Sequence, residues 1–290
     1  MIQERAGVIR DNRIDSGADC MDITFIGGGN MATALIGGLV AKGFAPGSIK
    51  VVEVAAQARA RLAQSFGVKC FERPAAAAPF GDVVVLAVKP QQMREVAREL
   101  APSLQGELVL SIAAGIRLAD LARWLGGYPR LARCMPNTPA LIGAGVTGLY
   151  ARAEAGPEGR QHAQAVLEAV GAVIWVGEEA LLDPVTAVSA SGPAYVFYFI
   201  EALERAAREL GLDAAGARQL AIGTFRGAAE LAARSSEAPA TLRERVTSKG
   251  GTTERALATL QADRVADAIV RAARAASERA RELGDEFGKD

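Results

Sequence analysis

Three consecutive glycines between an apolar run and a helical pattern constrain this fold more than any other feature of the sequence. The apolar run is Ile23–Ile26, and the helical pattern covers Met31–Lys42. The segment fits G-x-G-x-x-A: Gly27 permits the tight turn, Gly29 lets a pyrophosphate approach the backbone, and Ala32 lets the helix pack closely on the strand. The pattern predicts a strand–turn–helix unit that binds a dinucleotide at the helix start. The alternative is an ordinary glycine turn.

Further apolar runs follow the first, and amphipathic patterns separate most of them. Strands alternating with helices indicate crossover connections and a parallel sheet, and continuous apolar runs are typical of strands covered on both faces. We therefore predict an α/β domain with a Rossmann-like, doubly wound parallel sheet. The predicted strands are Ile23–Ile26, Ile49–Val54, Val83–Val88, Leu108–Ile112, Arg130–Cys134, Val146–Tyr150 and Val173–Val176. The predicted helices are Met31–Lys42, Gln57–Phe66, Gln91–Leu100, Leu118–Leu125 and Glu158–Val170.

The chain changes character after Glu178, where the β-branched runs stop and segments rich in Ala, Leu, Glu and Arg begin. This composition predicts an all-helical domain. We therefore divide the chain into residues 21–178, the dinucleotide-binding domain, and residues 179–290, the helical domain. Residues 1–20 contain no apolar stretch and are predicted to be a disordered extension, not a signal peptide. The predicted helices of the second half are Asp183–Leu210, Asp213–Ser235, Pro239–Thr247 and Thr253–Leu283.

The charge balance and the rare residue types exclude several classes of protein. The 290 residues hold 33 basic and 33 acidic side chains, so the chain lacks the basic surplus that nucleic-acid binding normally needs. One histidine and three separated cysteines argue against a metal site and fit a reducing cytoplasm. The longest uncharged segment, Pro184–Ile200, contains hydroxyl residues and a Gly-Pro pair, so we interpret it as a buried helix and not as a membrane span.

Glu53 ends the second apolar run, about twenty residues after the glycine turn, where an acidic residue commonly accepts a hydrogen bond from the adenosine ribose. An acidic side chain here favours NAD over NADP. The residues that follow offer no base before Arg59 to bind a 2′-phosphate. The alternative interpretation is a solvated charge at the end of a strand.

Several loops should meet at the edge of the sheet where the parallel strands end. They are Val88–Gln91, Ser111–Gly115 and Arg133–Pro139. Open α/β sheets bind their ligands outside the carboxyl ends of the strands, so these loops should border the nicotinamide end of a cofactor. Taken singly, each loop is also compatible with ordinary turn chemistry.

A second group of hydroxyl residues and glycines, Thr247–Thr253, interrupts the helical half just before a helix. Backbone N–H groups at such a helix start suit a carboxylate or a phosphate. A loop between two helices with a hydroxyl cap is the competing interpretation. The chain offers no histidine–carboxylate pair, which disfavours imidazole as an acid–base group. A substrate that is already a protonated iminium needs no strong protein acid, because its carbon accepts hydride directly.

These features together resemble one family, Δ1-pyrroline-5-carboxylate reductase, over residues 21–283. The resemblance rests on separated motifs in the family's order: IGGGNMA (26–32), AVKPQ (87–91), SIAAG (111–115), RCMPNTP (133–139), SGPAY (191–195) and TSKGGTT (247–253). It implies reduction of (S)-1-pyrroline-5-carboxylate to L-proline by NADH or NADPH. It also implies a Rossmann-like domain followed by a helical domain that forms an interlocked homodimer, with further assembly into decamers, and an active site built across the dimer interface.

The resemblance also implies roles for individual residues. The cofactor pyrophosphate is assigned to Gly27, Gly29, Asn30 and Met31. The nicotinamide side is assigned to Val88, Lys89, Ala113 and Ala114, with Pro90 and Asn137 as further candidates from the same loops. The substrate is assigned to Ser248, Gly250, Gly251, Thr252 and Thr253. Thr253, with its hydroxyl near the ring nitrogen, and Lys89 are the candidate catalytic residues; no metal is expected.

Three residues depart from the family pattern. Lys249 stands where the family often has proline, Ala190 replaces a frequent glycine, and Glu53 leans against the NADPH preference common in the family. Two other functions remain open from the residues. One is a β-hydroxyacid-type NAD(P) dehydrogenase, for which Lys249 is the candidate acid–base lysine. The other is a non-catalytic nucleotide-binding protein.

Overall fold

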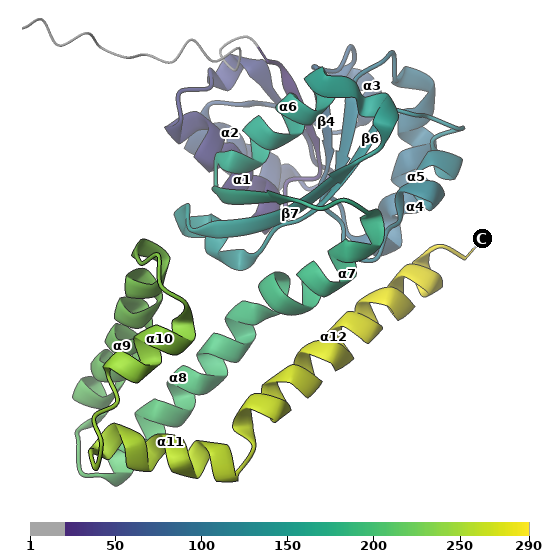
Figure 1. The fold of residues 1–290 in the computed structure, drawn as a ribbon. Coiled ribbons are helices and arrows are strands. Elements are labelled where there is room, and N and C mark those ends of the chain that lie inside the picture. The colour runs from purple at the N-terminus through teal and green to yellow at the C-terminus, as the bar shows by residue number, and fades with distance from the viewer. Residues whose placement is uncertain (1–20, 290) are drawn as a thin grey trace, which may run out of the picture.

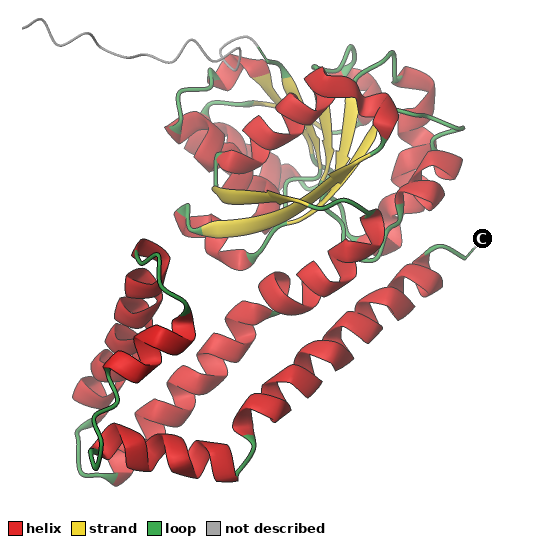
Figure 2. Ribbon diagram, in the orientation of Figure 1, coloured by secondary structure: helices red, strands yellow, loops and turns green. Residues whose placement is uncertain are grey.

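The computed structural model describes residues 21–289, so the predicted extension 1–20 lies outside the described residues. Figures 1 and 2 show a sheet with helices on both faces, followed by long helices that extend away from it. The eight strands form one sheet in the order β3-β2-β1-β4-β5-β6-β7-β8. Their bounds are β1 Ile23–Ile26, β2 Ile49–Val52, β3 Lys69–Phe71, β4 Val83–Leu86, β5 Leu108–Ser111, β6 Leu131–Met135, β7 Gly145–Ala151 and β8 Gly171–Trp175.

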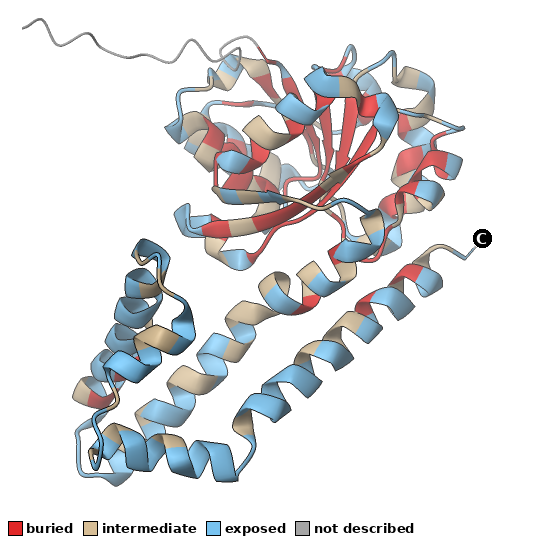
Figure 3. Cartoon of the chain, in the orientation of Figure 1, coloured by how far each residue is buried: buried red, intermediate tan, exposed pale blue. Residues whose placement is uncertain are grey.

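Helices cover both faces of the sheet and enclose two separate apolar cores. One core lies between the sheet and α1, α2 and α6, where Leu35, Leu62 and Val166 are fully buried. The other lies under α4 and α5, around Met93 and Leu121. Figure 3 shows the strands as the most buried part of the molecule, which confirms the doubly wound arrangement. The helices of this part are α1 Asn30–Ala41, α2 Ala56–Phe66, α3 Pro74–Ala77, α4 Pro90–Leu100, α5 Leu118–Trp124 and α6 Gly156–Glu168.

The sheet departs from the prediction in two places. Sequence analysis missed β3, which has three residues that are exposed or half-buried, so it leaves no apolar run to detect. The sheet is mostly parallel, as predicted, but β7 pairs antiparallel with β6. The segment between these strands contains only a short 3-10 turn, Thr138–Ile142, and a parallel return would need a longer crossover.

The second half of the chain is helical, as predicted, but two of its predicted helices are interrupted. The expected helix Asp183–Leu210 consists of α7, a π-helical turn over Thr186–Ala190, and α8. The expected helix Thr253–Leu283 is split into α11 and α12 at Arg264, which has a left-handed backbone (φ 52°). The bounds are α7 Leu182–Val185, α8 Gly192–Glu209, α9 Ala214–Arg234, α10 Pro239–Arg245, α11 Thr252–Ala262 and α12 Val265–Phe287.

The helical half leaves much of its apolar surface uncovered. Phe197, Tyr198, Leu220 and Leu231 are each more than half exposed, and the whole of α8 has no buried residue. Figure 3 shows exposed residues along most of α8 to α12. Contiguous apolar surface that stays exposed is typical of an interaction surface.

A buried arginine joins the sheet to the helical half. The Arg133 side chain, on β6, is only 4% exposed, and its Nη1 lies 3.1 Å from Glu179 Oε1 and its Nη2 3.9 Å from Asp183 Oδ1. Glu179 also accepts a hydrogen bond from the Leu118 N–H at the start of α5. Burial raises the pKa of Asp183 against the opposing effect of Arg133. The cluster fixes the point at which α7 leaves the sheet, because removing one partner would strand a buried charge.

We predict that Gly38→Ala destabilises the chain by about 1–3 kcal/mol, the usual cost of overpacking a filled core. A Cβ at Gly38, on α1, would lie 2.5 Å from the Ala169 carbonyl oxygen, so the backbone after α6 would have to move. Denaturant unfolding at fixed protein concentration measures the change. Gly47→Ala is the matched control, because its Cβ would meet no atom within 4 Å; equal stability of the two variants would contradict the prediction.

Candidate functional site

A cleft of about 580 Å³ opens at the edge of the sheet where β1 to β4 end. The strand order reverses between β1 and β4, and open α/β sheets bind ligands at such a switch point. The cleft lies at the glycine turn, where the sequence predicts a cofactor. The residues that line it lie between Ile26 and Glu99 and include Gly27, Gly28, Gly29, Glu53, Val54, Glu72, Arg73, Val88 and Lys89.

The glycine turn has the geometry that its sequence predicts. Gly27 has a φ of 105°, and a Cβ there would lie 2.7 Å from the Ala87 carbonyl oxygen, so only glycine fits. Gly29 is the N-cap of α1, and a Cβ there would meet no atom within 4 Å. The backbone at Gly29 therefore faces the open cleft, beside the first N–H groups of α1. This arrangement fits a pyrophosphate.

The first two residues of α1 differ in how far their side chains are exposed. Asn30 is exposed and Met31 is half-buried against the core under α1. Both belong to the first turn of α1, where backbone N–H groups have no partner within the helix. Their assignment to the pyrophosphate rests on these backbone groups and stays a prediction.

Glu53, which lines the cleft just after β2, is held in place by two hydrogen bonds. Its Oε2 accepts a hydrogen bond of 2.9 Å from the Gly28 N–H, and its Oε1 accepts one of 2.9 Å from the Ala55 N–H. The carboxylate therefore has a defined position, and each oxygen retains a free lone pair for a ribose hydroxyl. A negative charge fixed here opposes a 2′-phosphate.

The structure adds an arginine that sequence analysis did not find. Arg73 follows β3, and the parallel pairing of β3 with β2 brings it to the cleft beside Glu53. Arg59, the first base after Glu53 in the sequence, is already bound to the backbone: its Nη1 donates to the carbonyl oxygens of Glu53 (2.7 Å) and Val54 (2.8 Å). Only recognition of β3 would have revealed Arg73.

The residues assigned to the nicotinamide side are not all in this cleft. Val88 and Lys89 line it, and Lys89 is the N-cap of α4, which begins at Pro90. Ala113 and Ala114 follow β5 farther along the same sheet edge, with Ala113 nearly fully buried.

Asn137 has a structural role in this chain. Its Oδ1 accepts from the Val146 N–H (2.9 Å), and its Nδ2 donates to the Ser189 carbonyl oxygen (3.1 Å). The side chain is buried, so it joins the turn after β6 to the π-helical turn. Direct contact between this amide and a cofactor stays a prediction.

The predicted substrate residues form a turn that ends at the start of α11. Gly250 has a φ of 74°, and its N–H donates to Glu254 Oε2 at 2.6 Å. The Gly251 N–H donates to the Ser248 carbonyl oxygen. Thr252 and Thr253 then open α11, an eleven-residue helix whose N-cap has no side-chain hydrogen bond. Exposed hydroxyls and first-turn N–H groups therefore stand together, as an anion requires.

This substrate turn and the dinucleotide cleft are not brought together in one chain. In Figure 1, α11, which this turn opens, lies at the end of the helical half farthest from the sheet. The lining of the cleft comes entirely from the first half of the chain. Lys249, the acid–base candidate of the dehydrogenase alternative, is exposed on this distant turn. Within one chain, the turn and the cleft therefore do not form a single site.

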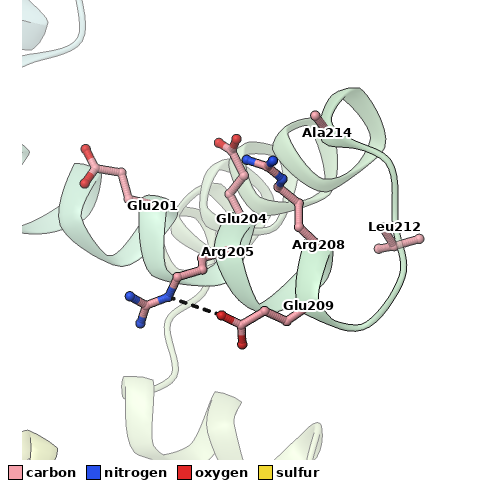
Figure 4. A pocket seen from close by; sticks show the side chains of 7 residues that line it. All are labelled: Glu201, Glu204, Arg205, Arg208, Glu209, Leu212 and Ala214. Atoms are coloured by element: carbon pink, nitrogen blue, oxygen red, sulfur yellow. Dashed lines mark ion pairs between the residues drawn. The ribbon is translucent and has the colours of Figure 1, made fainter.

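A larger hollow, of about 660 Å³, lies on the surface of α8 and the start of α9 (Figure 4). Its walls are charged side chains, among them Arg205 and Glu209, which are 3.9 Å apart. It includes no residue of the glycine turn or of the substrate turn. It lies on the uncovered face of the helical half and offers no reacting group.

The side chains of the described residues do not favour thiol or metal chemistry. Burial raises the pKa of the Cys134 thiol and, to a lesser degree, that of Cys70, so neither is an activated nucleophile. Within residues 21–289 no cluster of histidine, cysteine and carboxylate side chains is arranged to hold a metal ion. In the same range no helix is both long and apolar enough to cross a bilayer.

Two family profiles match the chain. Residues 179–283 match the profile "Pyrroline-5-carboxylate reductase dimerisation". Residues 22–115, which carry the cleft, match "NADP oxidoreductase coenzyme F420-dependent". The two matched segments correspond to the helical half and to the first five strands of the sheet.

Relatives with known names cover nearly the whole chain. The pyrroline-5-carboxylate reductase of Pseudomonas aeruginosa is 46% identical, over 92% of this chain and 98% of the relative. That of Escherichia coli is 38% identical, over 90% and 97%. Among solved structures, pyrroline-5-carboxylate reductase from Coxiella burnetii superposes with a TM-score of 0.87 at 40% identity, covering 91% of this chain and 98% of the other. The Plasmodium falciparum pyrroline carboxylate reductase, solved with NADP bound, gives 0.82 at 25% identity, covering 92% and 99%.

We predict that Gly29→Val weakens NADH binding at least tenfold, about 1.4 kcal/mol, because the new side chain enters the space assigned to the pyrophosphate. Stability should change by less than about 1 kcal/mol, since the N-cap has extended backbone and the position has no neighbour. Fluorescence titration with NADH and thermal unfolding measure the two effects. Gly27→Ala is the contrasting variant and should lose stability as well; unchanged NADH binding by Gly29→Val would remove this turn from the cofactor site.

Proposed function

The chain belongs to the pyrroline-5-carboxylate reductase family, and we propose that it reduces the C=N bond of (S)-1-pyrroline-5-carboxylate to give L-proline. The electron donor is a reduced nicotinamide dinucleotide, in keeping with the NADP-bound relative. The observation that carries the proposal is the cleft at the switch point of the sheet, which the glycine turn, Glu53 and Lys89 line together. The chain is also 46% identical to a named reductase over 92% of its length.

The residues present fit the dinucleotide. Gly27 and Gly29 leave the start of α1 open to the pyrophosphate, with Asn30 and Met31 supplying backbone N–H groups. Val88, Lys89 and Pro90 bound the nicotinamide side, and Ala113, Ala114 and Asn137 continue it along the edge of the sheet. When bound, the reduced dinucleotide supplies the hydride. The protein's part is to hold two rings face to face in a water-poor cleft.

The substrate is held by the turn before α11. Its carboxylate faces the first N–H groups of α11 and the hydroxyls of Ser248 and Thr252, while Gly250 and Gly251 let it approach the backbone. The Thr253 hydroxyl, next along the first turn, faces the ring nitrogen and accepts a hydrogen bond from the N–H of the protonated iminium, whose carbon then takes the hydride. Lys89 adds a positive charge at the cleft and completes the set of groups around the reacting atoms.

We propose NADH as the preferred donor. The Glu53 carboxylate is fixed by two backbone N–H groups, so it cannot turn away from a 2′-phosphate without breaking both. Arg73 lies in the same cleft and gives a 2′-phosphate one favourable partner, so NADPH is used less efficiently rather than excluded.

We propose that the working unit is a homodimer whose helical halves interlock, with each substrate turn serving the partner's cleft. The uncovered apolar face of the helical half and the match to the dimerisation profile support this. Residues 21–178 then act as the dinucleotide-binding domain and residues 179–290 as the dimerisation and substrate domain. Assembly of dimers into a decamer follows the family resemblance.

We place the enzyme in the cytoplasm. Cys70 and Cys134 are free thiols separated in the fold, which suits a reducing compartment.

The direct experiment mixes purified protein with pyrroline-5-carboxylate and either NADH or NADPH, and follows nicotinamide absorbance together with proline. Proline formed in step with loss of reduced cofactor supports the proposal. No proline with either cofactor rejects it. Oxidation of a small hydroxyacid with NAD would favour the dehydrogenase alternative, and tight NADH binding without turnover of any imine or hydroxyacid would favour a nucleotide-binding protein.

We predict that Glu53→Gln raises the NADPH-to-NADH ratio of kcat/KM about tenfold, the size of one charge–charge interaction of about 1.4 kcal/mol near a protein surface. Glutamine keeps the shape of the side chain but removes its charge. Steady-state kinetics with both cofactors measure the ratio. Arg73→Ala should move it in the opposite direction. Glu154→Gln is the control, because that carboxylate is exposed and does not line the cleft; an unchanged ratio in Glu53→Gln would contradict the ribose assignment.

A mixing experiment tests whether the site spans two chains. Thr253→Ala should lower kcat about tenfold to a hundredfold, as loss of a hydrogen bond that positions the reacting ring, while Thr259→Ala, later on α11, should not. Gly29→Val, with its weakened NADH binding, should turn over little when NADH is kept well below the dissociation constant of this variant. Refolded or coexpressed mixtures of Gly29→Val and Thr253→Ala should then recover about a quarter of wild-type activity, because random dimers hold one intact site per heterodimer. Absence of recovery would place both residues in the site of the same chain.

A further inference from the structure

The last turns of α12 lie against the loop that follows β5. A Cβ at Gly115 would lie 2.9 Å from Phe287 Cδ2 and 3.2 Å from Leu283 Cβ, so the Phe287 ring is in contact with the backbone of this loop. Gly115 also has a left-handed φ of 72°. Phe287 packs onto the apolar core that contains Ala113 and Ile116. One side of the loop is therefore closed by the C-terminal helix.

Two arginines of α5 fix this end of α12 in place. Arg117, the N-cap of α5, lies 2.7 Å from Asp285 Oδ1 through Nη1 and donates to the Arg281 carbonyl oxygen at 3.1 Å through Nη2. Arg123 donates to the Gly288 carbonyl oxygen at 2.8 Å. Gly284 lets the helix approach, because a Cβ there would lie 2.9 Å from Arg117 Nε. Backbone and side-chain contacts thus join α12 to α5, whose N-cap Arg117 lies two residues after the loop.

We infer that Phe287, supported by Leu283, is a positioning residue for the Ala113–Gly115 loop and so for the nicotinamide beside it. The inference rests on the proposed function, which assigns Ala113 and Ala114 to the nicotinamide side. The two alanines carry no group that could hold the ring by hydrogen bonding through a side chain. The placement of their backbone therefore decides where the ring lies, and displacement by about an ångström can cost up to a hundredfold in rate.

The two ends of α12 lie near two different parts of the proposed site. At its first end it follows α11, which carries the substrate turn, and at its last end it contacts the loop after β5 (Figure 1). The helix also packs along α7 and the π-helical turn on the way. The position of the loop thus depends on a segment more than 150 residues later in the chain, and not only on its packing against the sheet.

The test compares Phe287→Ala, Phe287→Leu and Leu125→Ala in the full-length protein. Leu125 is buried in the same apolar core, at the other end of α5, and is the control for simple loss of packing. Phe287→Ala should weaken NADH binding and lower kcat/KM for NADH about tenfold, and Phe287→Leu should recover most of the loss. Leu125→Ala should lower the Tm while leaving the KM for NADH within about twofold.

A double-mutant cycle makes the dependence on the loop explicit. Gly115→Ala places a methyl group against Phe287, so its effect on NADH binding should be at least about threefold smaller when combined with Phe287→Ala, as expected of contacting residues. Additive effects would overturn the inference, as would wild-type NADH binding by Phe287→Ala, or equal changes in Phe287→Ala and Leu125→Ala. NADH binding is read without substrate; a wild-type protein that binds NADH but makes no proline would therefore reject the proposed function while leaving this test intact.

Discussion

The close approach of β1 and β4 at their carboxyl ends is the constraint on which the site depends. The Gly27 N–H donates to the Val52 carbonyl oxygen at 2.8 Å, and the Ala87 N–H donates to the Ile26 carbonyl oxygen at 2.8 Å, so three neighbouring strands end in register. No side chain fits at Gly27 against Ala87. Because the strand order reverses here, the chain leaves the sheet on opposite faces and a cleft opens between the departing segments.

Both halves of the proposed site use the same physical device, the unpaired N–H groups at the start of a helix. In the sheet domain α1 begins after Gly29, and in the helical domain α11 begins after Gly251; each helix has a glycine N-cap in place of a capping side chain. Glycine leaves the N–H groups accessible to a ligand, where a serine or an aspartate at the N-cap would bind them itself. An anionic cofactor and an anionic substrate can therefore be bound without many cationic side chains, which agrees with a chain of zero formal net charge.

In the proposed dimer the sheet domain binds the cofactor and the helical domain binds the substrate and the partner chain. These roles explain why the helical half leaves apolar residues exposed. A long helical arm carries the substrate turn away from its own cleft, and the arm exposes apolar residues along α8 and α9. The arm is fixed to the sheet at two places: the buried Arg133 cluster at the start of α7, and the contacts of α12 with α5. These attachments fix the direction in which the arm leaves the sheet and, in the proposed dimer, the position at which a partner's turn would reach the cleft.

The sequence by itself determined the elements whose signals are local. Continuous apolar runs predicted the buried strands, and the glycine turn at Gly27 predicted its own left-handed backbone and its place before α1, because both follow from sterics within a few residues. Only the tertiary structure decided the rest. The edge strand β3 is too short and too exposed to leave an apolar run, so Arg73 became a cleft residue only through pairing of β3 with β2. The antiparallel direction of β7 follows from the connection after β6, which contains no helix long enough for a parallel crossover. The break at Arg264 depends on how α11 and α12 pack, because the residues around it include no glycine or proline. The separation of the substrate turn from the cleft is likewise a property of the direction of the helices in space, which no spacing along the chain encodes.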